Sequence, residues 1–409
     1  MKFRYNRTNE FTVLVNGDDD VNNLGVVRAL GRHGVPIILL SSNHQYVARY
    51  SRYINKWLRF PDPMESEDKY IESLIKLGKQ IEEKCVVIPT NDGAVMTLSK
   101  HKGELEQYFL LPIPSFEVVE KCVNKRMFYQ LLKQMSIPHP KTYFPKDLKE
   151  LKSIGEEMEY PYIIKPAYMH LFSAQFHIKC FFIDSPQTLN NAIQELEDKE
   201  LDVFLQEIIP GNEHYSLLTY FDSENEPQAS CGWDKIQQDP PFFGSYSVLC
   251  KSAWRAEPIA LAEQLLRTMK YHGIAEPEFK KDTRDNTYKL LEINARTSIP
   301  NALPAKCGTD ITHIAYLDTI GRYKGNLKSP ESGNFWVNDT FYLHDFFKLK
   351  FTKNMFSMNI INPLKRKRVY AVSAWDDPIP LLFALLNLGY RLFRKIFGIS
   401  ATKNKYRKK

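Results

Sequence analysis

Residues 289–296, with the sequence KLLEINAR, combine an apolar strand pattern with polar side chains at alternate positions. Side chains of a β-strand alternate between its two faces, so Glu292 and Asn294 lie on one face, which Arg296 continues if the strand geometry holds. A carboxylate and an amide side by side supply oxygen ligands for a hard cation such as Mg²⁺. A guanidinium beside them suits a developing phosphoryl or acyl-phosphate charge. The segment therefore predicts a strand that carries a metal and anion site.

A second acid precedes this strand in another short extended segment. Glu278 lies within residues 273–280, and the polar sequence DTRDN at 282–286 follows. Two apolar segments separated by such residues predict a β-hairpin. The hairpin would bring Glu278 beside Glu292. Taken alone, Glu-x-Asn is more typical of a surface acid on a strand that ends in a cap, so the interpretation depends on the rest of the chain.

Length and cysteine usage limit the class of protein. A chain of 409 residues with 25% charged residues is expected to form two or three soluble domains. The six cysteines are scattered and form no Cys-x-x-Cys pair, which argues against a zinc site and a disulfide scaffold. No apolar stretch follows the first residues, so we expect no signal peptide and a cytoplasmic protein.

The N-terminal residues follow the pattern of a doubly wound parallel sheet. A strand at 11–15, a helix at 22–33 and a strand at 35–40 form a βαβ unit. The first turn lacks G-x-G-x-x-G, which argues against a dinucleotide. A helix at 67–83 and a strand at 85–89 follow. Asp92 comes after that strand, either as a ligand-binding acid or as the N-cap of the next helix.

A domain boundary is predicted near residue 111, in LPIP. A helix over 118–135 carries Lys125, and a strand at 160–166 contains Lys165. Further strands are predicted at 203–209, near 215–221 and near 229–236, followed by a helix at 258–271. Lys165 lies at the mouth of its strand, where its charge can reach a phosphate.

The order and spacing of these polar residues resemble the ATP-grasp superfamily over residues 85 to about 321. The resemblance rests on Lys125, Lys165, Glu207, Glu213, Glu278, Glu292 and Asn294. It implies an α/β fold in which a doubly wound parallel-sheet domain precedes a two-lobed ATP-grasp domain with antiparallel sheets. The implied domains are residues 1–111, the ATP-grasp domain at 112–325 with its small lobe at about 140–210, a C-terminal extension at 326–378, and a basic amphipathic helix and tail at 379–409.

The resemblance also implies a role for each matching residue. Lys125 and Lys165 would contact the phosphates of ATP, while Glu278, Glu292 and Asn294 would hold one or two Mg²⁺ ions, with Mn²⁺ as an alternative. Arg296 would steady an acyl phosphate or tetrahedral adduct. The segment QEIIPGNE resembles the adenine hinge, in which the Glu207 carbonyl and Ile209 amide read the base and Glu213 binds the ribose, so the implied hinge residues are Gln206, Glu207, Ile208, Ile209 and Glu213.

One departure from the family pattern points to a subgroup. The loop after Lys165, residues 165–179, contains no glycine, so Ser173 or Lys179 would replace a glycine nest at the phosphates. A loop of this kind resembles D-aspartate ligase-like carboxylate–amine ligases, as does the segment 232–244. There, Lys235 would face the phosphates or the substrate carboxylate as a second catalytic residue.

The implied reaction is ATP-dependent ligation of a small carboxylate and an amine through an acyl phosphate, with release of ADP and phosphate. A thiol acceptor and a kinase outcome remain open. The alternative of another class is a non-catalytic ATP-binding module at a membrane surface. A homodimer is compatible with the resemblance, and the sequence does not identify the acid or the acceptor.

The basic character of the chain belongs to its C-terminal end. Eight of its cations follow Asp377 with no acid among them, and they exceed the net charge of +7, so the remaining chain is near neutral and a nucleic-acid partner is not expected. Residues 381–397 place a narrow polar stripe on an apolar helix that is too short to span a bilayer. The helix either docks on the globular body or contacts an anionic membrane, at the inner face of the cell membrane.

Overall fold

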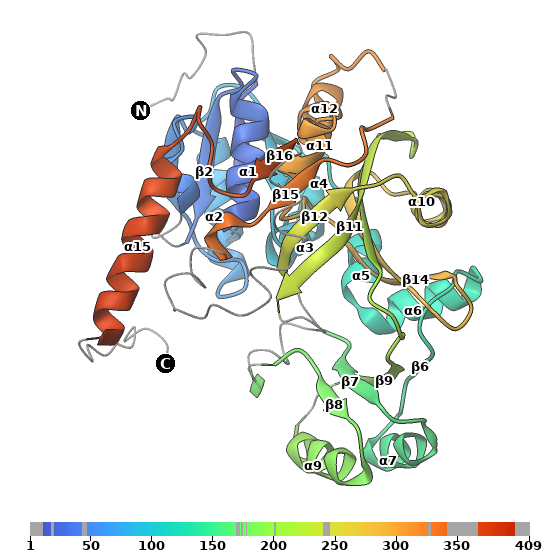
Figure 1. The fold of residues 1–409 in the computed structure, drawn as a ribbon. Coiled ribbons are helices and arrows are strands. Elements are labelled where there is room, and N and C mark those ends of the chain that lie inside the picture. The colour runs from blue at the N-terminus through green and yellow to red at the C-terminus, as the bar shows by residue number, and fades with distance from the viewer. Residues whose placement is uncertain are drawn as a thin grey trace.

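The computed structural model describes residues 11–17, 20–42, 47–168, 172, 175–176, 178–199, 202–239, 246–325, 329–341 and 367–396, with side chains up to residue 390. Three sheets organise these residues, as Figure 1 shows. The first is a five-stranded parallel sheet, the second a four-stranded antiparallel sheet, and the third a seven-stranded, mostly antiparallel sheet. The α/β class predicted from the sequence is confirmed.

The parallel sheet has the strand order β3-β2-β1-β4-β5, as expected for a doubly wound domain. Its strands are short and apolar, and Val13, Leu14 and Val15 at the centre are fully buried. The elements of this domain are β1 (Val13–Asn16), α1 (Asp20–Gly31), β2 (Ile37–Ser41), η1 (Val47–Tyr50), β3 (Lys56–Arg59), α2 (Glu67–Gly78), β4 (Cys85–Pro89), α3 (Asp92–Lys100), α4 (Lys102–Leu105) and β5 (Phe109–Leu110).

The four-stranded sheet forms a small lobe of its own, seen at the bottom of Figure 1. Its order is β6-β9-β7-β8, and Tyr162, Ile164 and Leu205 pack with two helices into a separate apolar cluster. The elements are β6 (Thr142–Tyr143), α7 (Leu148–Glu157), β7 (Tyr162–Pro166), β8 (Phe181–Ile183), α9 (Pro186–Leu196) and β9 (Val203–Glu207).

The seven-stranded sheet has the order β14-β13-β10-β11-β12-β15-β16. Residues 335–337 and 368–370, which we assigned to a C-terminal extension, supply β15 and β16 at one edge of this sheet. The remaining elements are α5 (Phe116–Val123), α6 (Lys125–Gln134), β10 (His214–Phe221), β11 (Pro227–Asp239), β12 (Tyr246–Ser252), α10 (Ala256–Thr268), β13 (Gly273–Lys281), β14 (Tyr288–Asn294), α11 (Ala302–Lys306), α12 (Ile311–Thr319), β15 (Phe335–Val337), β16 (Arg368–Tyr370) and α15 (Ile379–Ile396).

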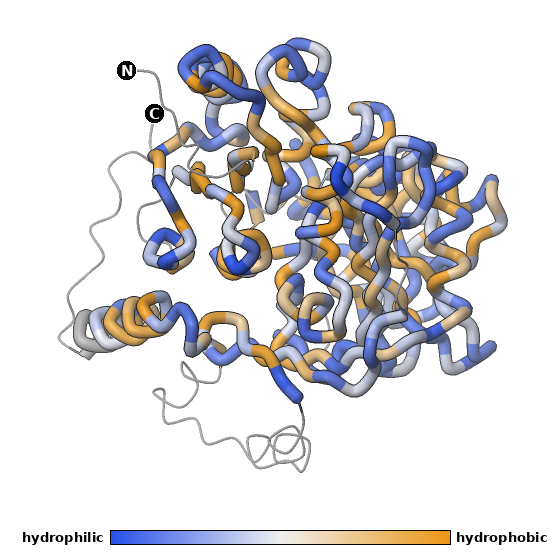
Figure 2. The backbone as a smooth tube through the Cα atoms, turned by 90° about the horizontal axis from the view of Figure 1, so that it is seen from above, coloured by the Kyte–Doolittle hydropathy of each residue, from blue (hydrophilic) through white to orange (hydrophobic). Residues whose placement is uncertain are grey.

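Hydrophobic segments gather inside the molecule and hydrophilic ones lie at its outer turns, as Figure 2 shows from above. Two large apolar clusters both combine residues of the parallel sheet with residues of the seven-stranded sheet. Val119 and Leu290 belong to one, and Trp233 and Leu303 to the other. The N-terminal domain and the large sheet therefore share continuous cores, which fixes their relative position.

Two helix predictions were wrong in their extent. The helix expected over 118–135 is two helices, because the side chain of Asn124 accepts hydrogen bonds from the amides of Arg126 and Met127 and caps a new helix. The helix expected to reach residue 83 ends at Gly78, where a side chain would collide with Tyr108. The first correction matters for the site, because it makes Lys125 the first residue of α6.

Candidate active site

The predicted hairpin forms from β13 and β14. Glu278 lies directly opposite Glu292, and Glu276 lies opposite Asn294. The turn closes through Asp282, whose amide donates to the Thr287 carbonyl at 2.8 Å. Cross-strand neighbours on one face lie within about 5.5 Å at Cβ. The hairpin thus gathers three carboxylates and an amide on one small area of the sheet.

Two lysines from other elements pair with these acids. The Nζ atom of Lys125, at the start of α6, lies 3.1 Å from Glu292 Oε2. The Nζ atom of Lys235, on β11, lies 2.5 Å from Glu278 Oε2. The Lys125 ammonium outweighs burial and lowers the pKa of Glu292 to about 2. Burial alone would lower the pKa of Lys235, but the carboxylates of Glu278 and Glu276 raise it well above its ordinary value. Both shifts favour the charged forms of Glu292 and Lys235.

Arg296 connects the hairpin to the N-terminal domain. Its Nε donates to Asp92 Oδ1 at 2.8 Å, and its Nη2 donates to Asn294 Oδ1 at 3.4 Å. Asp92 begins α3 at the carboxyl end of β4, but it is not the N-cap, because Asn91 accepts the capping bond from the amide of Ala94. The arginine therefore lies where the parallel sheet meets the hairpin.

Glu276 is a site residue that our sequence analysis did not select. It is 5% exposed and accepts a hydrogen bond from Asn294 Nδ2 at 3.1 Å, while the same nitrogen lies 3.2 Å from Glu278 Oε1. Burial, followed by the charge of Glu278, raises the pKa of Glu276 to about 8. The signal was available, because residues 276 and 278 of a strand share a face just as 292 and 294 do.

These side chains surround one cavity of about 780 Å³ between the N-terminal domain and the hairpin. This volume lies in the range of about 300–1,000 Å³ typical of small-molecule sites. Acidic and basic side chains both line its wall, and they are paired with one another rather than separated by sign. Of the predicted site residues, the cavity is lined by Lys125, Lys179, Lys235, Glu278, Glu292, Asn294 and Arg296.

The other predicted residues lie on the small lobe or at its junction with β10, beyond this lining. Lys165 Nζ donates to Gln206 Oε1 at 3.2 Å, and Gln206 Nε2 donates to Thr142 Oγ1 at 2.9 Å. Burial lowers the pKa of Lys165, although the charge of Glu292 opposes it. Lys165 is therefore close enough to Glu292 to be affected by its charge. The backbone connects the same two regions, because the amide of Lys125 donates to the Ala167 carbonyl at 3.1 Å.

The segment compared with an adenine hinge follows β9. The Glu207 carboxylate accepts from the Lys141 amide at 2.7 Å and pairs with Arg284 at 2.8 Å. Ile209 is buried, Ile208 is half-buried, and the side chain of Glu213 is exposed. Ser173, our alternative to Lys179 in the glycine-free loop, lies outside the described residues.

The acids suit Mg²⁺ better than they suit a metal ion whose ligands are all protein side chains. Although Glu276, Glu278 and Glu292 share one face of the hairpin, no three His, Cys, Asp or Glu side chains within the described ranges are grouped so that they could hold a metal ion by themselves. Mg²⁺ does not need such a group, because it binds one or two carboxylates and completes its shell with substrate phosphates and water. Glu278 and Glu292 supply two carboxylates, and each already faces a cationic ammonium group.

Comparisons with known proteins point in one direction. No family model matches the chain. The D-aspartate ligase of Enterococcus faecium (strain Aus0004) is 25% identical over 304 residues, which cover 70% of this chain and 71% of the relative. An L-amino acid ligase from Bacillus licheniformis has a similar structure, with a TM-score of 0.59 and 15% identity over 80% of this chain and 78% of its own.

A second solved structure extends the similarity to a nucleotide complex. The biotin carboxylase domain of the Hydrogenobacter thermophilus 2-oxoglutarate carboxylase has a TM-score of 0.61 and 16% identity, and the match covers 79% of this chain and 73% of that one. That structure contains MgADP, ADP and bicarbonate. The chain therefore shares its fold with a domain whose structure was determined with a bound nucleotide.

Proposed function

We propose that this chain, which is an ATP-grasp carboxylate–amine ligase, activates a small carboxylic acid with ATP and couples it to an amine through an acyl phosphate. The proposal rests on one observation above all. Glu278, Glu292 and Arg296 face the same cavity, and each is already held by an oppositely charged partner.

The nucleotide would lie between the small lobe and the hairpin. In this arrangement Lys165, Lys125 and Lys179 contact the phosphates, and residues 206–209 contact the adenine. Gln206 is 1% exposed and bonded to both Lys165 and Thr142, which gives this part of the lobe a fixed shape. Glu213 is exposed and available to the ribose hydroxyls. The lowered pKa of Lys165 reflects a buried cation that a triphosphate would stabilise.

Glu278, Glu292 and Asn294 would hold one or two Mg²⁺ ions. A bound ion would neutralise the phosphate charge during transfer. Lys125 and Lys235 now balance the two carboxylates. With those acids engaged by a cation, Lys125 and Lys235 would be free to turn toward the phosphates or the substrate carboxylate, and the charges of the site would stay paired.

The chemistry has two steps. An oxygen of the substrate carboxylate attacks the γ-phosphorus, the bond from that phosphorus to the bridging oxygen breaks, and ADP leaves. The amine nitrogen then attacks the carbonyl carbon, the carbon–oxygen bond to phosphate breaks, and the amine loses a proton. In this proposal Arg296 would balance the negative charge of the acyl phosphate and of the tetrahedral adduct. Lys235 would orient the carboxylate.

A defined assay tests this function. Purified protein is incubated with MgATP and pooled amino and hydroxy acids, and ADP release is measured beside Glu292→Gln, which removes a charge from the metal site at constant volume. Glu104→Gln, at an exposed position of α4, is the matched control. We expect acid-dependent ADP release in the parent and in Glu104→Gln but not in Glu292→Gln.

The intermediate needs its own measurement. If the acid carries ¹⁸O in its carboxylate, an acyl phosphate transfers one labelled oxygen to inorganic phosphate. A kinase would instead leave phosphate on the product, and a thiol acceptor would give a thioester that hydroxylamine cleaves. ATP binding without turnover in any pool would favour the alternative of a non-catalytic nucleotide-binding module.

A further inference from the structure

The C-terminal helix α15 (Ile379–Ile396) packs on the N-terminal domain by one face over residues 379–390, where its side chains are described. The ring of Phe383 lies 3.8 Å from that of Tyr50 on η1, measured between centroids. Leu381 and Ala384 pack against the adjoining apolar cluster. Figure 1 shows the helix along the outer side of the N-terminal domain. Of the two alternatives predicted from the sequence, docking on the globular body is therefore correct for this face of the helix.

The opposite face of α15 exposes large apolar side chains. Ile379, Leu382, Leu386 and Tyr390 are 51 to 62% exposed. Their spacing of three or four residues places them in one stripe along the helix. Trp375, which precedes the helix, is fully exposed. In Figure 2 the helix lies at the edge of the molecule, where hydrophobic residues follow its length. We name these five residues the outer stripe.

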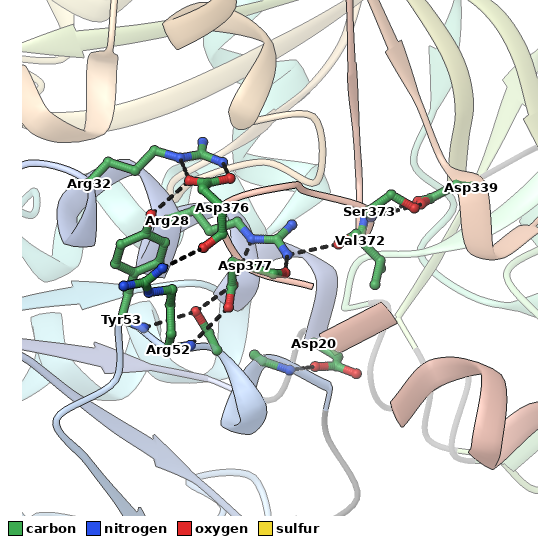
Figure 3. Close-up of polar contacts among 12 residues, drawn as sticks. Asp20, Arg28, Arg32, Arg52, Tyr53, Asp339, Val372, Ser373, Asp376 and Asp377 are labelled. Carbon is green, nitrogen blue, oxygen red and sulfur yellow. Dashed lines mark hydrogen bonds and ion pairs between the residues drawn. The ribbon is translucent and has the colours of Figure 1, made fainter. Parts of the chain in front are cut away.

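Two aspartates directly before the helix hold it in this orientation. Asp377 is fully buried, and its carboxylate accepts from Arg28 Nε at 3.0 Å, Ser51 Oγ at 2.7 Å and the Arg52 amide at 2.9 Å. Asp376 accepts from Arg32 Nε and from the Tyr53 hydroxyl, both at 2.7 Å. Figure 3 shows both aspartates among these partners. The outer stripe is therefore presented by a fixed element.

The charge of the segment indicates what covers the stripe. Eight lysines and arginines follow Asp377, with no acid among them. Such a segment is attracted to anionic surfaces, because each cation near an anionic membrane adds to the binding. A second copy of the same helix would bring eight like charges toward eight others, which opposes self-association. An exposed Trp beside an apolar helical face is also typical of residues at a membrane interface.

We propose that the outer stripe binds the surface of a bilayer rich in anionic lipids, with α15 lying in the plane of the interface. Crossing the bilayer is not required, because no helix in the described part of the chain is long and apolar enough to span one. A basic helix with one apolar face is the form that interfacial anchors take. The globular body would then remain fixed at the membrane by the contacts of Asp376 and Asp377.

Vesicle flotation tests the proposal with full-length protein. The parent is compared with Leu382→Gln/Leu386→Gln, which keeps helix-forming residues but removes two apolar side chains from the stripe. Trp254→Gln is the control, because Trp254 is also an exposed apolar residue but lies far along the chain before α10. We expect binding to phosphatidylglycerol-rich vesicles, weakened by salt, and at least a roughly tenfold loss in the double variant alone.

Three outcomes would overturn the proposal. These are equal flotation of the parent and double variant, equal binding to pure phosphatidylcholine vesicles, and a dimer of the parent that the double variant loses without any vesicle binding. The last result would assign the stripe to a second copy. ADP release without vesicles should be the same in both proteins, so failure of this proposal and failure of the ligase assignment are distinguishable.

Discussion

Lys125 and Glu292 lie 3.1 Å apart although 167 positions separate them in the chain. The lysine is the first residue of α6, and the acid lies on β14. Their contact joins the helix that leads into the small lobe to the strand that carries the predicted metal ligands. The contact thus links the α6 part of the candidate site directly to its β14 part.

Substitution of Lys125 should affect catalysis and nucleotide binding together. Lys125→Met removes the partner of Glu292 and a cation that we assign to the phosphates, so we expect acid-dependent ADP release to fall about a hundredfold. The thermal shift produced by MgATP should also decrease. Lys133→Met, at an exposed position of the same helix, is the control and should change neither quantity. Normal turnover in Lys125→Met would remove this lysine from the site.

The pair formed by Arg296 and Asp92 should behave as a unit. Arg296→Ala is expected to lower kcat about a hundredfold, because it removes the cation beside the acyl phosphate. Asp92→Asn should have a smaller effect, since it weakens only the 2.8 Å contact that orients the arginine. In the Arg296→Ala background, Asp92→Asn should add almost nothing. Additive losses would mean that Asp92 contacts a substrate by itself, and Asp68→Asn on α2 controls for a general change of charge.

Asp377 and Asp376 should differ in their contribution to stability. Asp377→Ala leaves the buried Arg28 without its carboxylate, which should cost about 3 kcal/mol of unfolding free energy. Asp376→Ala breaks a pair that is 38% and 43% exposed, and should cost no more than about 1 kcal/mol. Urea unfolding followed by tryptophan fluorescence measures both. Equal losses would show that burial does not separate the two pairs.

His214 on β10 should make stability depend on pH. Burial, and then the nearby charges of Lys280 and Lys235, lower its pKa from 6.5 to about 3. Between these values the unfolded chain binds a proton that the folded chain does not, so stability is complete above about pH 6.5 and decreases as the pH falls toward 3. His214→Gln should flatten the change of Tm between these values. An unchanged slope would show that His214 is protonated in the folded state.

The hairpin and the parallel sheet could be predicted from local sequence patterns. Glu278 and Glu292 were expected to be neighbours because apolar segments of period two were separated by turn residues, and β13 and β14 pair them directly. The βαβ pattern at residues 11–40 predicted a unit of a doubly wound parallel sheet, and β1 and β2 pair in parallel. The hairpin depends on residues close in sequence, and the parallel sheet depends on the repeated βαβ connection.

Other features depended on neighbours that no local pattern names. Residues 118–135 were predicted to form one helix, because their apolar spacing continues across Asn124. The capping contacts of the Asn124 side chain instead begin a second helix there. The strand pattern could have placed Glu276 on the face of Glu278, but the burial that raises the pKa of Glu276 comes from distant elements. For Asp92 the sequence left ligand binding and helix capping open, and the structure gives the cap to Asn91 and pairs Asp92 with Arg296.

The sequence by itself determined the element types, the hairpin that carries the acids and the apolar, basic character of the C-terminal segment, because side-chain periodicity and charge are properties of the local chain. Only the tertiary structure decided which lysine pairs with which acid, how deeply Glu276 is buried, and which face of α15 meets the body. Those properties arise from contacts between elements far apart in the chain, where the position of one group sets the solvent exposure and charge around another.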